Sequence, residues 1–205
     1  MKIKFCGMTN EKDAQDAISL GADALGFIFY EKSPRFVKAE IVEKILPFIP
    51  PFVQVVGVFV NQDKAYIEEV SERCRLDIIQ LHGDESPHHC LSYKKRVIKA
   101  IRVACDEDIK KIQSYQGMVS AILLDSKQDN SYGGTGQTFD WGLALQAKEF
   151  NIPIVLSGGI RPENIKKAVT LVNPFALDIC SGVEEEPGIK AYQKMQDALV
   201  IAAKV

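Results

Sequence analysis

The chain has 205 residues, 46% of them hydrophobic and 25% charged, a composition that excludes a disordered chain and a disulfide-dependent mini-protein. Its 25 Lys and Arg against 27 Asp and Glu give a formal charge of −2, without the basic surplus of a nucleic-acid-binding protein. No apolar run approaches the roughly 20 residues of a membrane span, and the N-terminal MKIKFCGMTNEKD is polar where a signal peptide would be apolar, so we expect a cytoplasmic protein with no nucleic-acid or membrane partner.

Eight short runs rich in β-branched and aromatic residues alternate with eight longer segments of helical periodicity. In chain order, the predicted strands cover 3–6, 24–29, 53–60, 76–81, 96–103, 119–124, 152–157 and 175–180. The predicted helices lie near 11–20, 38–48, 63–74, 86–94, 105–115, 139–149, 161–172 and 188–203. Thr9 or Asn10 can cap the first helix and Gly21 can end it, while Ser86-Pro87 and Arg161-Pro162 are typical of helix starts.

This alternation of strands and helices requires parallel strands joined by helical crossovers. Eight units share 205 residues, about 26 residues each, and roughly 200 residues is the lower size limit of a closed (β/α)8 barrel. The sequence therefore predicts an α/β protein with a single (β/α)8 TIM barrel as its catalytic domain, residues 1–205. An open doubly wound sheet is the alternative, but no GxGxxG fingerprint follows the first predicted strand.

Cysteine and histidine spacing does not indicate a metal site. The five cysteines are scattered and no CxxC pair occurs, so neither a disulfide framework nor a zinc cluster is predicted. His88 and His89 fall in a predicted helix with no third ligand nearby in the sequence. We therefore expect no metal.

Reactive and polar residues gather just after the predicted strands, where barrel enzymes carry their chemistry. The opposite strand ends are mostly short polar loops, and this asymmetry favours an enzyme over an inert scaffold. The residues at the carboxyl ends are Cys6 to Thr9, Ser33 to Arg35, Asn61, Gln80 to Glu85, Arg102, Asp125, Ser157 to Gly159, and Asp178 to Gly182.

Glycine-containing loops follow the last two predicted strands, at Gly158-Gly159 and Ser181-Gly182. Phosphate sites of such barrels commonly use these two loops, because glycine lets backbone N–H groups approach an anion. Glycine also simply ends strands, so either loop alone would be weak support. Together they predict a phosphate subsite.

Cys6 and Asp125 end the first and sixth predicted strands, so in a closed barrel they flank the predicted phosphate subsite and face one another. A thiolate and a carboxylic acid placed in this way suit proton removal and proton delivery. Lys4 lies two residues before Cys6, on the same face of its strand, and its ammonium is expected to lower the thiol pKa. A buried structural cysteine is the alternative for Cys6.

Other polar residues near the same rim allow two interpretations each. Arg35 can grip a substrate carboxylate with two hydrogen bonds, or it can be a surface arginine. His82 can act as an acid, a base or an anion donor, or it can be a buried packing residue. The long loop with Gly133-Gly134-Thr135-Gly136 is either an active-site lid or plain connection.

The motifs KFCGMT, ADALGFIFYEKSPR, VGVFVN, IIQLHGDE, LLDS, GGTGQTFDW, LSGGIRPEN and DICSGVEEEPGIK occur in this order along the chain. Together they resemble the phosphoribosylanthranilate isomerase family of tryptophan biosynthesis, from the first strand to the last helix. The resemblance implies a cofactor-independent aldose–ketose isomerase, an intramolecular oxidoreductase, acting on a phosphorylated small molecule. Its reaction would be the Amadori rearrangement of N-(5-phosphoribosyl)anthranilate to 1-(2-carboxyphenylamino)-1-deoxyribulose 5-phosphate.

The resemblance also implies roles for individual residues. Asp125 matches the general acid that opens the ribose ring, Cys6 matches the general base at C2, and Arg35 matches the arginine that holds the anthranilate carboxylate. The loops around Gly158-Gly159 and Ser181-Gly182 match the phosphate cradle. Three further positions are expected near the substrate: His82, Gly136 and Asp178.

Three positions depart from the family pattern. Cys180 stands where serine or asparagine is more frequent, and Ser157 where alanine is common. Ala191 replaces a frequent aspartate, which removes any capping of the last helix by that side chain.

Two alternative functions are considered. One is another phosphosugar-processing barrel enzyme, such as a Schiff-base aldolase with Lys99, and the other is a non-catalytic barrel that binds a phosphometabolite. Both a monomer and a homodimer remain open.

Overall fold

Eight parallel strands close into one barrel in the order β1 to β8, so the predicted (β/α)8 barrel is confirmed. The computed structural model describes residues 1–126 and 139–205. The barrel strands are β1 (Lys2–Cys6), β2 (Ala24–Ile28), β3 (Gln54–Phe59), β4 (Ile78–Leu81), β5 (Arg96–Val103), β6 (Ala121–Ser126), β7 (Ile154–Leu156) and β8 (Ala176–Ile179).

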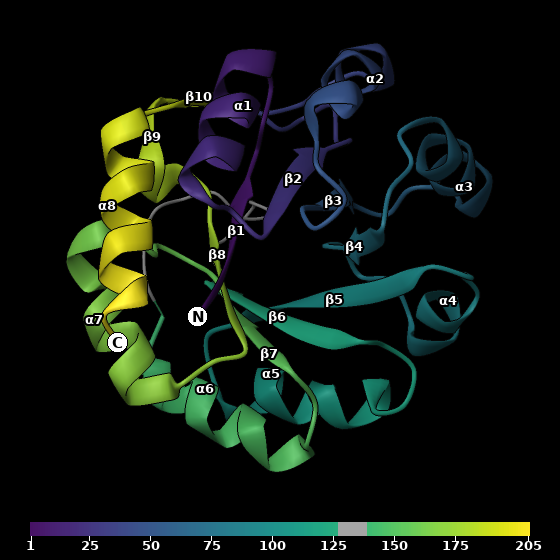
Figure 1. Ribbon diagram of the computed structural model, residues 1–205. Helices are drawn as coiled ribbons and strands as arrows, with labels where there is room; N and C mark the ends of the chain where they lie inside the picture. Colours follow the sequence, from purple (N-terminus) through teal and green to yellow (C-terminus); the bar gives the residue numbers. More distant parts are fainter. Residues whose placement is uncertain (127–138) are drawn as a thin grey trace.

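The α-helices follow one another around the outside of the barrel in chain order (Figure 1). They are α1 (Glu11–Leu20), α2 (Ala39–Ile45), α3 (Lys64–Arg73), α4 (Pro87–Leu91), α5 (Asp106–Lys110), α6 (Trp141–Ala147), α7 (Pro162–Val172) and α8 (Tyr192–Ala203). Short 3-10 turns at Leu46–Phe48, Lys111–Tyr115 and Lys148–Phe150 continue α2, α5 and α6. None of the helices in the described ranges is long and apolar enough to cross a membrane.

Local signals explain where several helices begin and end. The Asn10 side chain accepts a hydrogen bond from the backbone N–H of Asp13, and Gly21 ends α1 with φ at 95°, a left-handed conformation that glycine adopts without strain. The Ser86 hydroxyl caps α4 ahead of Pro87. Ala191 precedes α8 without a side-chain cap, as its replacement of a capping residue predicts.

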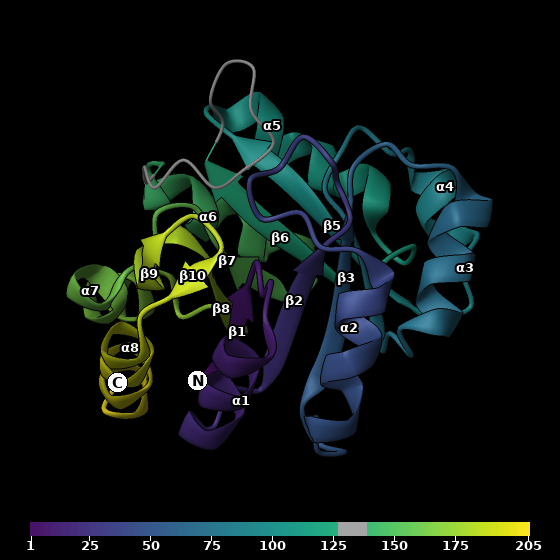
Figure 2. The same cartoon turned by 90° about the horizontal axis from the view of Figure 1, so that it is seen from above.

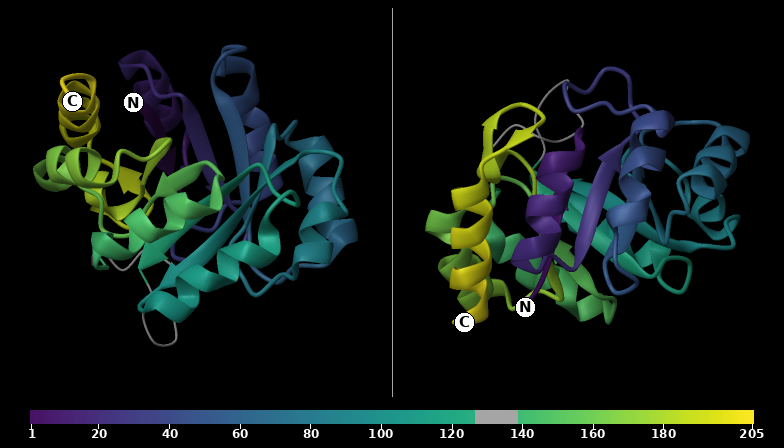
Figure 3. Two further views of the ribbon diagram at one scale, coloured as in Figure 1. Left: turned by 90° about the horizontal axis from the view of Figure 1, so that it is seen from below. Right: turned by 45° about the horizontal axis from the view of Figure 1, so that its top comes forward.

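The segment before α8 differs from the prediction. Instead of a helix beginning at 188, the chain forms a small antiparallel hairpin of β9 (Glu184–Glu186) and β10 (Ile189–Lys190). Pro187-Gly188 forms its turn, because Gly188 has φ at 89° and proline cannot continue a strand. Figures 2 and 3 show this hairpin at one end of α8, beside the start of α1.

Side chains alternate along each strand between the barrel interior and the helical layer. The lower interior is apolar, formed by Ile98, Ala100, Ala121, Leu123, Val155 and Ala176. Two residues further along, the same faces of β6, β7 and β8 carry Asp125, Ser157 and Asp178. The interior therefore changes from a packed apolar core to a polar mouth at the carboxyl ends of the strands.

Candidate active site

One pocket opens at this polar mouth and unites five of the ten predicted site residues, without the four residues predicted to hold the phosphate. Cys6, Arg35, His82, Asp125 and Asp178 all line it, although they come from five different βα units. Each of the five is nearly buried, with 4–8% of its surface exposed. The remaining lining residues are Ile28, Tyr30, Ser33, Val58, Val60, Gln80, Ser157 and Cys180.

Cys6 lies against a second cysteine, Cys180. Strands β1 and β8 pair in parallel up to Phe5 and Ile179, so the next residue of each strand brings the two thiols together. A hydrogen bond to Cys180 and burial raise the pKa of the Cys6 thiol well above its ordinary value. The same hydrogen bond lowers the pKa of Cys180.

The expectation that Lys4 lowers the pKa of Cys6 overall is therefore wrong. Lys4 does act in that direction, but the contact with Cys180 and the burial of the thiol outweigh it. The Lys4 ammonium is also engaged elsewhere, with its Nζ 2.8 Å from Asp178 Oδ1 and 2.7 Å from Gln80 Oε1. Burial acts to lower the pKa of Lys4, but the charges and hydrogen bonds of Asp178 and Cys6 together outweigh this effect and raise the pKa, so the ammonium stays charged.

A chain of hydrogen bonds fixes the tautomer of His82. Lys4 has only donors, so the Gln80 side chain must turn its oxygen toward Lys4 and its Nε2 toward His82 Nδ1, 2.9 Å away. Nδ1 then accepts, and the imidazole proton resides on Nε2. That Nε2 lies 3.2 Å from Asp125 Oδ2. His82 is thus a donor to Asp125 rather than an isolated packing residue.

Asp125 is held from two sides. Its Oδ1 accepts a hydrogen bond of 2.8 Å from the backbone N–H of Ser126, and its Oδ2 faces His82. Asp125 lines the same pocket as Cys6. The two residues predicted as acid and base therefore share one cavity.

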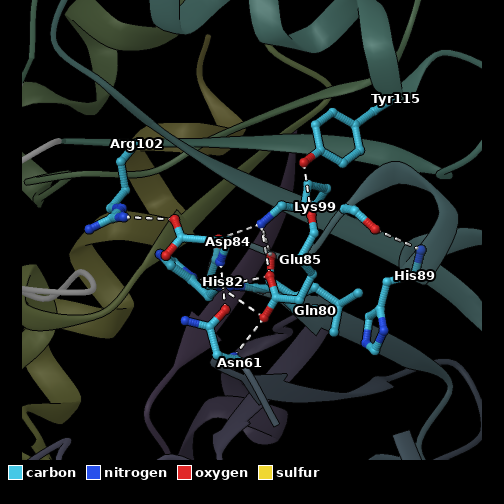
Figure 4. A network of polar contacts seen from close by, with 12 residues as sticks. Asn61, Gln80, His82, Asp84, Glu85, His89, Lys99, Arg102 and Tyr115 are labelled. Carbon is cyan, nitrogen blue, oxygen red and sulfur yellow. Dashed lines mark hydrogen bonds and ion pairs between the residues drawn. The ribbon is translucent and has the colours of Figure 1, made fainter. Parts of the chain in front are cut away.

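A second network, drawn in Figure 4, holds the loop that carries His82. Lys99 Nζ donates to the carbonyl of Gly83 at 2.7 Å and to Glu85 Oε2 at 2.9 Å, and both side chains are 3% exposed. Glu85 in turn accepts from the backbone N–H groups of Asn61 and Gly83. Lys99 is therefore an anchor of this loop, and it does not line the mouth pocket as a Schiff-base lysine would.

Arg35 forms a buried ion pair that sequence reasoning missed. Its partner is Glu184 of the β9–β10 hairpin, with Nη2 2.7 Å from Oε2 and side-chain exposures of 8% and 4%. Burial acts to lower the pKa of Arg35, but the hydrogen bonds and charge of Glu184, together with the nearby Cys180 and Cys6, outweigh burial and raise the pKa. Lys190, the residue that closes the hairpin, lies 2.8 Å from the same carboxylate. The Pro187-Gly188 turn signal could have revealed the hairpin, but nothing local connects it to Arg35.

The two predicted phosphate loops lie against each other at the ends of β7 and β8. A Cβ at Gly182 would overlap the carbonyl oxygen of Ile160, so only glycine permits this approach. No hydrogen bond to another described residue uses the backbone N–H of Gly159 or Gly182. Gly136, also expected near the substrate, lies outside the described residues.

No group of three or more His, Cys, Asp or Glu in the described ranges is arranged to hold a metal ion. His89, which the sequence placed beside His88 in a predicted helix, contacts Tyr93. Its Nε2 lies 2.8 Å from the tyrosine hydroxyl.

Comparisons with known proteins agree on one family. The family model for N-(5'-phosphoribosyl)anthranilate isomerase matches residues 3–200. The N-(5'-phosphoribosyl)anthranilate isomerase of Geobacter metallireducens is 48% identical over 197 residues, which cover 96% of each chain.

Solved structures agree with this match. The phosphoribosyl anthranilate isomerase of Thermotoga maritima is 39% identical, with a TM-score of 0.93 and full coverage of both chains. A structure of such an isomerase in complex with reduced 1-(o-carboxyphenylamino)-1-deoxyribulose 5-phosphate is 37% identical, with a TM-score of 0.90 and the same coverage. Because sequence and fold match over nearly the whole length, the chain belongs to the N-(5'-phosphoribosyl)anthranilate isomerase family.

Proposed function

We propose that the protein catalyses the Amadori rearrangement of N-(5-phosphoribosyl)anthranilate to 1-(2-carboxyphenylamino)-1-deoxyribulose 5-phosphate in tryptophan biosynthesis. The observation that carries the proposal is the convergence of Cys6, Asp125 and Arg35 on one pocket of a chain from this family. The whole chain, residues 1–205, acts as one catalytic domain.

The reaction needs one acid and one base. Asp125, as the acid, protonates the ribose ring oxygen, so that the C1–O bond breaks and the ring opens to a Schiff base. Cys6, as the base, removes the proton from C2 to give an enolamine, which tautomerises to the ketose. Asp125 must carry a proton before it acts, and the Nε2–H of His82, 3.2 Å from Asp125 Oδ2, orients this carboxyl group as a hydrogen-bond donor.

These steps move protons within one molecule and leave no net oxidation of the substrate. An acid and a base are therefore sufficient, and we assign the enzyme to the cofactor-independent intramolecular oxidoreductases. The hydrogen bond between the two thiols gives the Cys6 proton a neighbouring acceptor in Cys180. Loss of that proton leaves a thiolate on Cys6, the form a base requires.

Different residues bind the two ends of the substrate, the carboxylate and the phosphate. Arg35 takes the anthranilate carboxylate, and the free N–H groups of Gly159 and Gly182, with Gly158 and Ser181 beside them, take the phosphate. Asp178 pairs with Lys4 at 2.8 Å and is a carboxylate itself, so we assign it to the surroundings of the substrate and not to the binding of either anion.

The test is the loss of phosphoribosylanthranilate fluorescence with the purified protein, with the labile substrate generated in situ and the product identified by chromatography. Protein-dependent loss of fluorescence with formation of the ketose is expected. A folded protein that binds the substrate without converting it would instead support the non-catalytic barrel.

A further inference from the structure

A small network of buried charges adjoins the pocket, and two of its three members have no role in the reaction proposed above. Its members are Arg35 from the loop after β2, Glu184 from β9 and Lys190 from β10. Glu184 and Lys190 are register partners across the hairpin, so their side chains are neighbours. Arg35 is 149 positions away from Glu184 in the sequence.

Glu184 occupies one edge of the Arg35 guanidinium and leaves another edge free. Nε lies 2.9 Å from Oε1, and Nη2 lies 2.7 Å from Oε2. The guanidinium has five N–H donors, so a second Nη2 donor and both Nη1 donors remain. No hydrogen bond to another described residue uses Nη1, and Arg35 lines the mouth pocket. The remaining edge, with one N–H of Nη1 and one of Nη2, can therefore bind a carboxylate through two parallel hydrogen bonds.

Lys190 fixes Glu184 in turn. Its Nζ donates to Glu184 Oε1 at 2.8 Å, to the carbonyl of Cys6 at 2.6 Å and to that of Cys180 at 3.2 Å. These three acceptors use all three ammonium donors, and the side chain is fully buried. The hairpin is thereby fastened to the ends of β1 and β8, so that the position of Glu184 is tied to that of Cys6.

The charges of the network also suit a carboxylate ligand. Two cations and one anion leave a single positive charge beside the pocket. A bound carboxylate would neutralise it in a poorly solvated place, where charge pairing is stronger than in water. Without Glu184, the long arginine side chain would have to be ordered by the ligand itself, which costs rotamer entropy.

We propose that Glu184, anchored by Lys190, is a positioning residue that holds the free edge of Arg35 toward the substrate carboxylate. This inference rests on the proposed function, because it names the group that Arg35 binds. Glu184 does not touch the reacting atoms, and it acts through Arg35.

The test is a double-mutant cycle with Glu184→Gln and Arg35→Met, measured as kcat/KM with phosphoribosylanthranilate. Glu184→Gln is expected to lower kcat/KM at least about tenfold, mainly through KM, because a charge-assisted hydrogen bond is lost. In the Arg35→Met background, the same change is expected to alter kcat/KM less than about twofold. Equal losses in both backgrounds would show a merely structural role and overturn the proposal.

Glu186→Gln is the matched control, because Glu186 is exposed on the same strand, and it is expected to match the wild type. Circular dichroism verifies the fold of each variant. If the Arg35→Met variant does not fold, the Arg35→Lys variant takes its place in the cycle. Lysine keeps the positive charge but lacks the paired N–H donors of the guanidinium.

The same cycle is run on the dissociation constant of the reduced product by calorimetry. A wild-type chain that binds the reduced product but does not convert phosphoribosylanthranilate contradicts the proposed function. The binding cycle still tests the role of Glu184 in that case. Unchanged affinity in Glu184→Gln, or no binding by the wild type, would overturn the inference.

Discussion

His82 Nε2 lies 3.2 Å from Asp125 Oδ2, although the two residues belong to β4 and β6 ends that are separated in the barrel by β5. The contact is possible because both side chains point into the barrel mouth. It places the Nε2–H of the imidazole directly beside the carboxyl that we assign as the acid. Gln80, held by Lys4, sets the orientation of that imidazole through its contact with Nδ1.

The first prediction concerns the tautomer of His82. In the wild type, ¹⁵N NMR of the imidazole is expected to report a proton on Nε2 and none on Nδ1 in the neutral form. Gln80→Met removes the donor to Nδ1, so a mixture of tautomers is expected in that variant. A wild-type ring protonated on Nδ1 would contradict the hydrogen-bond chain from Lys4.

The second prediction concerns the thiol pair. Of the effects that raise the pKa of Cys6, the hydrogen bond to the neighbouring Cys180 is the largest. The substitution Cys180→Ala is therefore expected to lower the pKa of Cys6. The midpoint of the pH dependence of Cys6 alkylation by iodoacetamide, followed by peptide mass spectrometry, should then move to lower pH. An unchanged or higher midpoint would mean that the two thiols do not share a proton.

The third prediction concerns the buried pair of Lys99 and Glu85. Lys99→Met leaves the Glu85 carboxylate buried without its cation and is expected to lower the free energy of unfolding by about 3–5 kcal/mol. Urea denaturation measures the loss, with Lys110→Met on the exposed surface of α5 as the control, expected within about 0.5 kcal/mol of wild type. Adding Glu85→Gln should restore part of the stability. A loss no larger than that of the control would show that the pair does not hold the His82 loop.

The fourth prediction concerns acid stability. Burial acts to raise the pKa of Glu184, but the hydrogen bonds and charges of Arg35 and Lys190 outweigh it and lower it. A carboxyl whose pKa is lower in the folded than in the unfolded chain stabilises the fold above its unfolded pKa, and this contribution is lost as the pH falls through the folded pKa. The difference in unfolding free energy between wild type and Glu184→Gln should therefore shrink between pH 7 and pH 3. A difference that stays constant over this range would contradict the charge network.

Strand periodicity explains why much of the site was predictable. Lys4 and Cys6, or Leu123 and Asp125, lie two residues apart on one face of a strand, so closing the barrel is enough to gather the polar ones at its mouth. The eight repeated units make that closure visible in the sequence. This geometry suggests the proposed acid and base, and the resemblance supplies the proposed substrate.

What could not be predicted depends on contacts between distant segments. Cys180 meets Cys6 only because β8 pairs with β1 when the barrel closes, and that contact reverses the expected pKa shift of Cys6. The β9–β10 hairpin is too short to produce a periodic pattern. Its link to Arg35 spans 149 positions and depends on side-chain packing that no local signal encodes.

The turnover numbers of Cys6→Ala and Asp125→Asn test the central claim most directly, because each change removes one of the two proton-transfer groups. With phosphoribosylanthranilate fluorescence as the readout, each variant is expected to lose at least about 10²-fold in kcat while remaining folded. Cys105→Ala, at an exposed cysteine, should match the wild type. Near wild-type kcat in either Cys6→Ala or Asp125→Asn would contradict the assignment of acid and base.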